Sequence, residues 1–113
     1  KDLTAWQKAM DFVELIYKIT GDFPESEKFG LTSQLRRASI SIPSNLAEGS
    51  GRKSTKEFIQ FLYIALGSSS EIETQLEIAM RLGYMKNQAN TFDLLTDIRK
   101  LIQGLIRSLK KKV

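Results

Sequence analysis

Apolar residues recur at three- and four-residue spacing in four segments of this chain, which is the period of an α-helix with one buried face. Short stretches rich in glycine, proline and serine separate the segments and are typical of turns. A lone strand would leave its backbone groups unsatisfied, and nothing else in the chain offers it a partner. The pattern predicts an all-α fold, and the short connections predict an antiparallel up-and-down four-helix bundle.

The first helix is expected from Thr4, as its N-cap, to about Thr20, with Gly21 ending it. A turn follows, with a short helical piece beginning at Pro24. The expected apolar stripe of this helix consists of Leu3, Trp6, Met10, Val13 and Tyr17, widened by Phe12, Ile16 and Ile19.

The second helix is expected over residues 30–48. Its stripe is Leu31, Leu35, Ala38, Ile42 and Leu46. Residues 39–42 alternate with period two before Pro43, which locally resembles a strand, but no partner strand exists. Because proline lacks an N–H and crowds the preceding turn, this helix is expected to be kinked at Pro43, with nearby serines satisfying the freed backbone groups.

The third helix begins at a capping box, in which Ser54 accepts from the Glu57 amide and the Glu57 carboxylate returns to the Ser54 amide. It is expected to reach about Leu82, where Gly83 ends it. Its core face consists of Phe58, Phe61, Leu62, Ala65, Ser69, Ile72 and Leu76. The fourth helix is expected from about Gln88 to Lys111, with the stripe Phe92, Leu95, Ile98, Ile102, Leu105 and Leu109.

The stretch "GSGRKS", residues 49–54, has the composition of a phosphate-binding loop but not its spacing. Arg52 stands between Gly51 and Lys53, and a helix rather than a buried strand precedes the loop. We interpret it as a helix connector, with Gly49 closing the second helix and Ser54 opening the third. Weak anion binding by Arg52 and Lys53 remains the alternative.

The composition argues against catalysis. The 113 residues suit one domain over 1–113, and they include no cysteine and no histidine. The commonest general base, thiolate chemistry and the commonest metal ligands are therefore absent. Glu71, Glu73 and Glu77 lack the spacing of a dimetal site. We expect no catalytic, cofactor-binding or metal-binding residues and no small-molecule substrate.

No apolar run is long enough to span a membrane, and no secretory signal is visible in the sequence, so a cytoplasmic protein is expected. In residues 58–66, "FIQFLYIAL", every residue except Gln60 is apolar. A helix that is apolar all round must be covered on more than one side. Ile59, Tyr63 and Leu66 are therefore candidate residues of an interface between copies, unless the second helix covers them.

The net charge of +4 is concentrated near the C-terminus. This cluster consists of Arg99, Lys100, Arg107, Lys110, Lys111 and Lys112. Cations near a helix C-terminus compensate the helix dipole and aid solubility, and they also form a surface suited to polyanions.

Three stretches carry a family resemblance: "SIPSNLAEGSGR" at residues 41–52, "KEFIQFLYIALGSSSEIETQL" at 56–76 and "LGY" at 82–84. With these the chain resembles the bacterial four-helix-bundle family named for proteins encoded in intervening sequences of 23S rRNA genes. It is similar also to the accessory proteins of diversity-generating retroelements. The resemblance implies a homo-oligomeric ring, expected to be a pentamer, and RNA contacts at Arg36, Arg37, Arg52, Lys53 and the C-terminal cluster.

Two functions follow as hypotheses. The first is a non-enzymatic homo-oligomer that binds structured RNA or a ribonucleoprotein through phosphate contacts, with many copies adding their charge. The second is a protein–protein assembly or adaptor module in which the basic end serves solubility.

Overall fold

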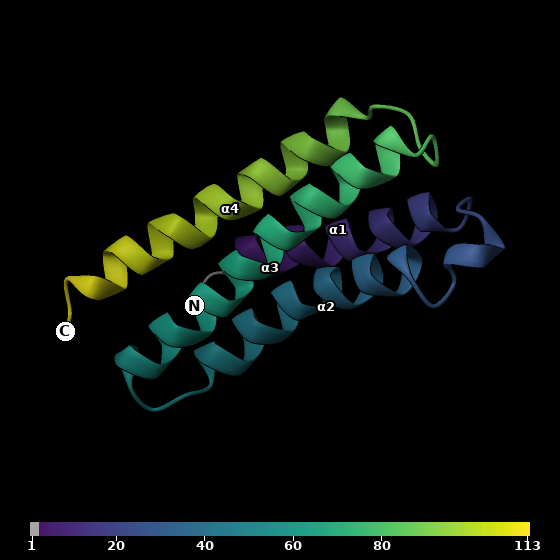
Figure 1. Ribbon diagram of the computed structural model, residues 1–113. Helices are drawn as coiled ribbons and strands as arrows, with labels where there is room; N and C mark the ends of the chain where they lie inside the picture. The colour runs from purple at the N-terminus through teal and green to yellow at the C-terminus, as the bar shows by residue number, and fades with distance from the viewer. Residues whose placement is uncertain (1–2) are drawn as a thin grey trace.

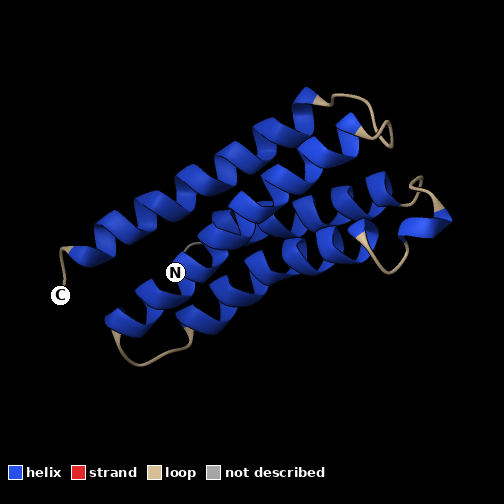
Figure 2. Ribbon diagram, viewed as in Figure 1, coloured by secondary structure: helices blue, strands red, loops and turns tan. Residues whose placement is uncertain are grey.

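A computed structural model of the chain describes residues 3–113. It contains α1 (Leu3–Thr20), a short 3₁₀ helix η1 (Glu25–Glu27), α2 (Leu31–Ser50), α3 (Thr55–Arg81) and α4 (Ala89–Lys110). The described residues form helices and turns, without a strand (Figure 2). The all-α prediction is confirmed, and each helix lies within two residues of its predicted bounds.

The helices form an antiparallel bundle in which each is joined to the next by a short connection (Figure 1). α1 packs on α2 and α4, and α3 packs on the same two helices. The body measures 46 × 25 × 19 Å. The α2–α3 connection and the C-terminus lie toward one end of the long axis, and η1 and the α3–α4 connection lie toward the other (Figure 1).

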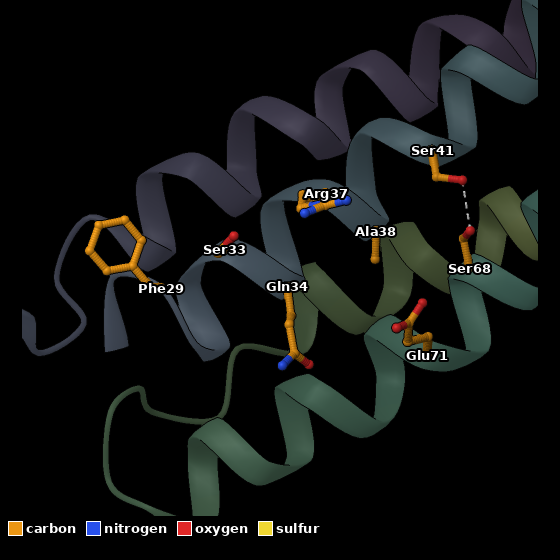
Figure 3. Close-up of a pocket in the computed structure, with 8 residues that line it drawn as sticks. All are labelled: Phe29, Ser33, Gln34, Arg37, Ala38, Ser41, Ser68 and Glu71. Atoms are coloured by element: carbon orange, nitrogen blue, oxygen red, sulfur yellow. Dashed lines mark hydrogen bonds between the residues drawn. The ribbon is translucent and has the colours of Figure 1, made fainter. Parts of the chain in front are cut away.

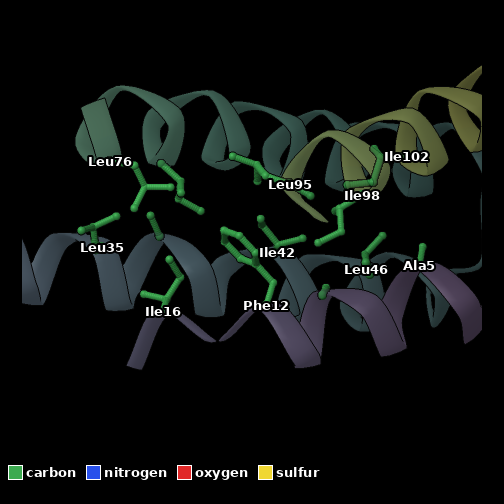
Figure 4. Close-up of a cluster of buried hydrophobic side chains, with 14 of the residues drawn as sticks. Ala5, Phe12, Ile16, Leu35, Ile42, Leu46, Leu76, Leu95, Ile98 and Ile102 are labelled. Carbon is green, nitrogen blue, oxygen red and sulfur yellow. The ribbon is translucent and has the colours of Figure 1, made fainter. Parts of the chain in front are cut away.

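The core is formed by aliphatic side chains with Phe12 and Phe23, and the side chains of α1 and α2 face those of α3 and α4 (Figure 4). The predicted stripe of α2 is buried throughout. On α3 the residues Leu62, Ala65, Ser69, Ile72 and Leu76 are buried, while Phe58 and Phe61 are half-buried. On α4 the residues Leu95, Ile98 and Ile102 are buried, and Phe92, Leu105 and Leu109 pack partly against the core.

The predicted stripe of α1 was wrong in its centre. The buried apolar residues are Ala5, Ala9, Phe12, Ile16 and Ile19. Met10 and Tyr17 are exposed, and Trp6 and Val13 are half-buried beside them; the prediction for the Leu3 side chain lies outside the described part. Ala5 and Ala9 thus take core positions in the first half of α1, whereas Met10 and Tyr17 lie outside the core face.

Pro43 lies inside α2, where it is buried, and the helix continues through it to Ser50. The bend at this residue stays a prediction. Among the nearby serines, Ser39 donates to the Arg36 carbonyl at 2.9 Å, and the Ser41 carbonyl accepts from the Asn45 side chain at 2.7 Å. Side-chain hydrogen bonds thus run along the helix on both sides of the proline.

Three predicted helix ends need correction. α1 begins at Leu3, so Thr4 lies inside its first turn rather than at the cap. The Ser54 hydroxyl accepts from the Glu57 amide at 3.1 Å as predicted, but the Glu57 carboxylate faces the Ser54 hydroxyl at 3.4 Å instead of the amide. Gly49 lies within α2 and does not end it.

Gly49, in the last turn of α2, and Gly83, which follows α3, have different physical roles. A Cβ on Gly49 would lie 2.8 Å from both Phe58 Cδ1 and Phe61 Cβ, so its missing side chain allows α3 to approach α2. Gly83 has φ 79° and ends α3 as predicted. Its N–H bonds to the Met80 carbonyl at 3.0 Å and that of Tyr84 to the Ala79 carbonyl at 2.9 Å, which is the Schellman arrangement.

Candidate functional site

Two basic segments that are far apart in sequence lie at one end of the bundle (Figure 1). Lys110, in the last turn of α4, lies over the ring of Tyr63 in the first half of α3, with Nζ 5.5 Å from the ring centroid. The α2–α3 connection lies at the same end. We call this surface the basic end; it consists of Arg52, Lys53, Lys56, Arg107, Lys110, Lys111 and Lys112, all exposed.

Arg52 is held in place at the basic end by two contacts. Its guanidinium forms an ion pair with Glu48 one turn earlier and lies 4.8 Å from the centroid of the Phe61 ring. Lys110 stands over Tyr63 in a comparable way. Cations placed over aromatic faces keep their charge and lose some of their mobility, which suits them to phosphate oxygens.

Other predicted RNA contacts lie elsewhere and serve the fold. Arg36 donates to Thr20 Oγ1 at 2.9 Å and stacks 4.4 Å from the Tyr17 ring centroid, so it joins α2 to α1. Arg99 pairs with Glu73 at 2.8 Å and so joins α4 to α3. Arg52 also has an internal partner, but it lies in the α2–α3 connection. Arg36, near the start of α2, and Arg99, in the middle of α4, do not lie at that end, so we leave them out of the basic end.

Arg37 and Lys100 are exposed but do not belong to the same cluster. Arg37 faces the groove between α2 and α3. Lys100 precedes Arg107 by seven residues, and so lies on the same face of α4 about two turns away. The sequence did not separate these roles, because helical periodicity shows which residues share a face but not which neighbouring helix packs against that face.

The candidate interface residues also divide. Ile59 is 8% exposed and belongs to the core of its own chain, so its assignment to an outward interface is corrected. Leu66 packs partly against that core, whereas Tyr63 is 46% exposed. Ile64 is 51% exposed and was missed, although the run apolar on all sides was a signal that some residue there had to face outward.

A groove of about 380 Å³ runs between α2 and α3 (Figure 3). Ser41 and Ser68 face each other across it, with the Ser68 hydroxyl donating to Ser41 Oγ at 2.9 Å. Arg37 comes from α2 and Glu71 from α3, and no ion pair joins them within the described part of the chain. The rest of the lining is Phe29, Ser33, Gln34 and Ala38.

Gln75 is a buried amide next to this groove and is 5% exposed. Its Nε2 donates to Gln34 Oε1 and Glu71 Oε2, both at 3.4 Å. Its Oε1 is buried and has no hydrogen-bond partner among the described residues. Such a group is costly unless a donor reaches it, so the groove edge has unused hydrogen-bonding capacity.

Two residues at the opposite end of the bundle, Glu27 and Tyr84, have shifted pKa values. The Leu31 N–H and the Tyr84 hydroxyl both donate to the Glu27 carboxylate, at 3.0 and 2.9 Å, and they lower the pKa of Glu27. The bond to that carboxylate, together with desolvation, raises the pKa of Tyr84. Both pKa values move away from neutrality, which suits a structural role rather than proton transfer.

The described residues contain no group of three or more acidic, cysteine or histidine side chains placed to hold a metal ion. Glu73 is engaged by Arg99, and Glu71 faces the groove. Across residues 3–113, no helix combines the length and apolar character that crossing a membrane requires.

The arrangement of four helices and the motifs on α2 and α3 can be compared with known proteins. The family model described as 23S rRNA-intervening sequence protein matches residues 1–106. The chain belongs to this family. A solved relative is the crystal structure of a protein with unknown function from the S23 ribosomal protein family of Bacteroides thetaiotaomicron VPI-5482.

The two chains are 29% identical and superpose with a TM-score of 0.81, covering 91% of this chain and 98% of the other. The similarity to this solved structure therefore extends over nearly the whole chain. No curated protein matches the chain.

Proposed function

We propose that this chain is a non-enzymatic cytoplasmic protein that assembles from identical copies into a ring, expected to be a pentamer, and binds structured RNA through its basic end. The observation that carries the RNA proposal is the convergence of the α2–α3 connection and the end of α4. A polyanion lying across that end would meet cations from both segments at once.

The seven cations of the basic end outnumber the two carboxylates in the same segments, Glu48 and Glu57. Glu48 is engaged by Arg52, and Glu57 faces the Ser54 hydroxyl at the start of α3. Lys53, Lys111 and Lys112 are exposed at the same end. Phosphate contacts of this kind bind without base specificity and weaken with salt, because binding releases condensed counterions.

Assembly would multiply a modest surface. A single copy offers only a few phosphate contacts, whereas linked copies raise the effective concentration of each further contact. Exposed Tyr63, Ile64 and Ile78 on α3 are the kind of large apolar residues that association covers. The proposal therefore couples RNA affinity to the state of assembly.

The test is fluorescence anisotropy of a labelled RNA hairpin titrated with the protein over a series of salt concentrations. Changing Lys110, Lys111 and Lys112 to Gln together should weaken binding and reduce the slope of log affinity against log salt by about 2–3. Lys86→Gln is the matched control, since this exposed lysine lies in the α3–α4 connection at the opposite end.

Absence of salt-dependent RNA binding by the wild-type protein at low ionic strength would reject the RNA proposal. Equal losses in the triple variant and in Lys86→Gln would reject the basic end as its location. Capture of a protein partner that tolerates the triple change would favour the assembly or adaptor alternative.

A further inference from the structure

Two surfaces on different sides of the bundle are left uncovered by the chain itself. One is the shoulder of α1, where Met10 and Tyr17 are 37% and 41% exposed and Val13 is half-buried between them. Ile40 of α2 extends this surface, because it follows Arg36 by one turn and Arg36 reaches Tyr17. We call this surface the α1 shoulder: Met10, Val13, Tyr17 and Ile40.

The second surface is the α2–α3 groove described above. The side chains that line it are mostly small or polar, among them Ala38, Ser41 and Ser68 (Figure 3). Ile64 and Ile78 are exposed on α3, the helix that forms one wall of the groove. The α1 shoulder thus offers large side chains, and the groove offers space between small ones, which is the relation that knobs-into-holes packing requires.

The charges beside the two surfaces are also complementary. Arg37 and Glu71 face the groove and form no ion pair within residues 3–113. On α1, Glu14 is exposed one turn after Met10, and Lys18 is exposed one turn further along the same side; neither is in the ion pairs of the described chain, and Arg36 adds a cation beside Tyr17. Glu14 and Lys18 beside the shoulder are therefore opposite in charge to Arg37 and Glu71 of the groove, in that order.

From this we infer that the α1 shoulder of one copy docks in the α2–α3 groove of a second copy, with Glu14 of the first near Arg37 of the second. The inference rests on the proposed assembly of identical copies and assigns its two surfaces. Because the surfaces differ, the contact is head-to-tail, and repetition closes a ring or extends a filament. A two-fold dimer would instead pair one surface with itself.

Complementation between two variants tests the inference. Met10→Glu places a charge in the shoulder, and Ser68→Trp fills the groove; each should reduce the wild-type assembly to the 12.8 kDa monomer in light scattering after size exclusion. Mixing the two should give a one-to-one dimer, because each variant retains the surface that the other has lost. Circular dichroism checks that both stay helical, and Glu71→Trp at an exposed lining position replaces Ser68→Trp if that variant unfolds.

Thr96→Glu is the control, since it adds the same charge to an exposed position on α4 outside both surfaces and should leave the mass unchanged. A second pair uses charge: Arg37→Glu should weaken assembly, and Glu14→Arg added to the same chain should restore it. Helical Met10→Glu with wild-type mass, or no dimer on mixing folded variants, would overturn the inference. A monomeric wild-type protein would instead remove the proposed assembly itself.

Discussion

The Tyr84 hydroxyl lies 2.9 Å from Glu27 Oε2 and joins the segment before α2 to the connection between α3 and α4. The other oxygen of the same carboxylate accepts from the Leu31 N–H at the start of α2. One side chain thus caps a helix and fastens two connections that are 57 residues apart. Because this hydrogen bond joins two ionisable groups, the stability of this end depends on the protonation of Glu27 and Tyr84.

This link predicts a defined pH dependence of unfolding. The pKa of Glu27 is lowered in the folded chain, so its contribution is present above the ordinary carboxyl pKa of about 4.3 and is lost as pH falls through the lowered value. The pKa of Tyr84 is raised, so its contribution is present below about 10 and is lost as pH rises through the raised value.

Urea unfolding of Glu27→Gln across acid pH should therefore show a smaller loss of stability on acidification than the wild-type protein shows. Tyr84→Phe should remove the alkaline part while keeping the cap on Leu31. An acid profile of Glu27→Gln that matches the wild-type profile would show that the carboxylate contributes nothing to the folded state.

Two glycines predict opposite results for the same substitution. Gly49→Ala should cost about 1–3 kcal/mol, because the new Cβ would press on Phe58 and Phe61 at 2.8 Å. Gly67→Ala should instead stabilise by about 0.5–1 kcal/mol, because it lies inside α3 and nothing lies within 4 Å of the new atom. Denaturant unfolding at one fixed protein concentration measures both, and equal signs would contradict the packing described.

Loss of the α3 N-cap should be measurable by itself. Ser54→Ala removes the oxygen that accepts from the Glu57 amide, and should cost about 1 kcal/mol. Ser54→Asp keeps an acceptor and serves as the control. A Ser54→Ala protein as stable as Ser54→Asp would mean that water replaces the cap without loss.

Arginines inside the bundle and lysines at the basic end should separate stability from RNA binding. Arg36→Gln removes the bond to Thr20 and the stacking on Tyr17, and should cost roughly 1–2 kcal/mol, with RNA affinity unchanged when variant and wild type are compared in the same state of assembly. Lys111→Gln should lower RNA affinity and leave unfolding unchanged. The reversed pattern would return Arg36 to the set of RNA contacts.

Helix positions and the core of α2 were predictable because large aliphatic residues mark that face unambiguously. The face of α1 was not, because Ala5 and Ala9 contribute little to an apolar pattern that Trp6 and Met10 dominate. The role of Gly49 was also hidden, since a glycine near a helix end suggests a cap, and its contact with Phe58 and Phe61 depends on how two helices approach.

The sequence showed which kinds of residue the candidate site contains, but not which individual residues belong to it. Basic residues near the C-terminus and at residues 52–53 were visible, yet their meeting at one end depends on the antiparallel order of the helices. Arg36 and Arg99 have the same chemistry, and only their neighbours Tyr17 and Glu73 show that they bind within the chain. Ile59 was misplaced because a short apolar run does not reveal which side faces the core.

The gathering of cations at one end of a body 46 Å long gives the molecule a direction. Copies related by rotation about an axis along the bundle would all point the same way, and their basic ends would form one basic rim. Copies related by a two-fold axis across the bundle would cancel that polarity. A head-to-tail ring with its axis along the bundles would therefore have two different faces. RNA would bind to the basic face, and the face that carries Glu27 and Tyr84 would point away from the RNA.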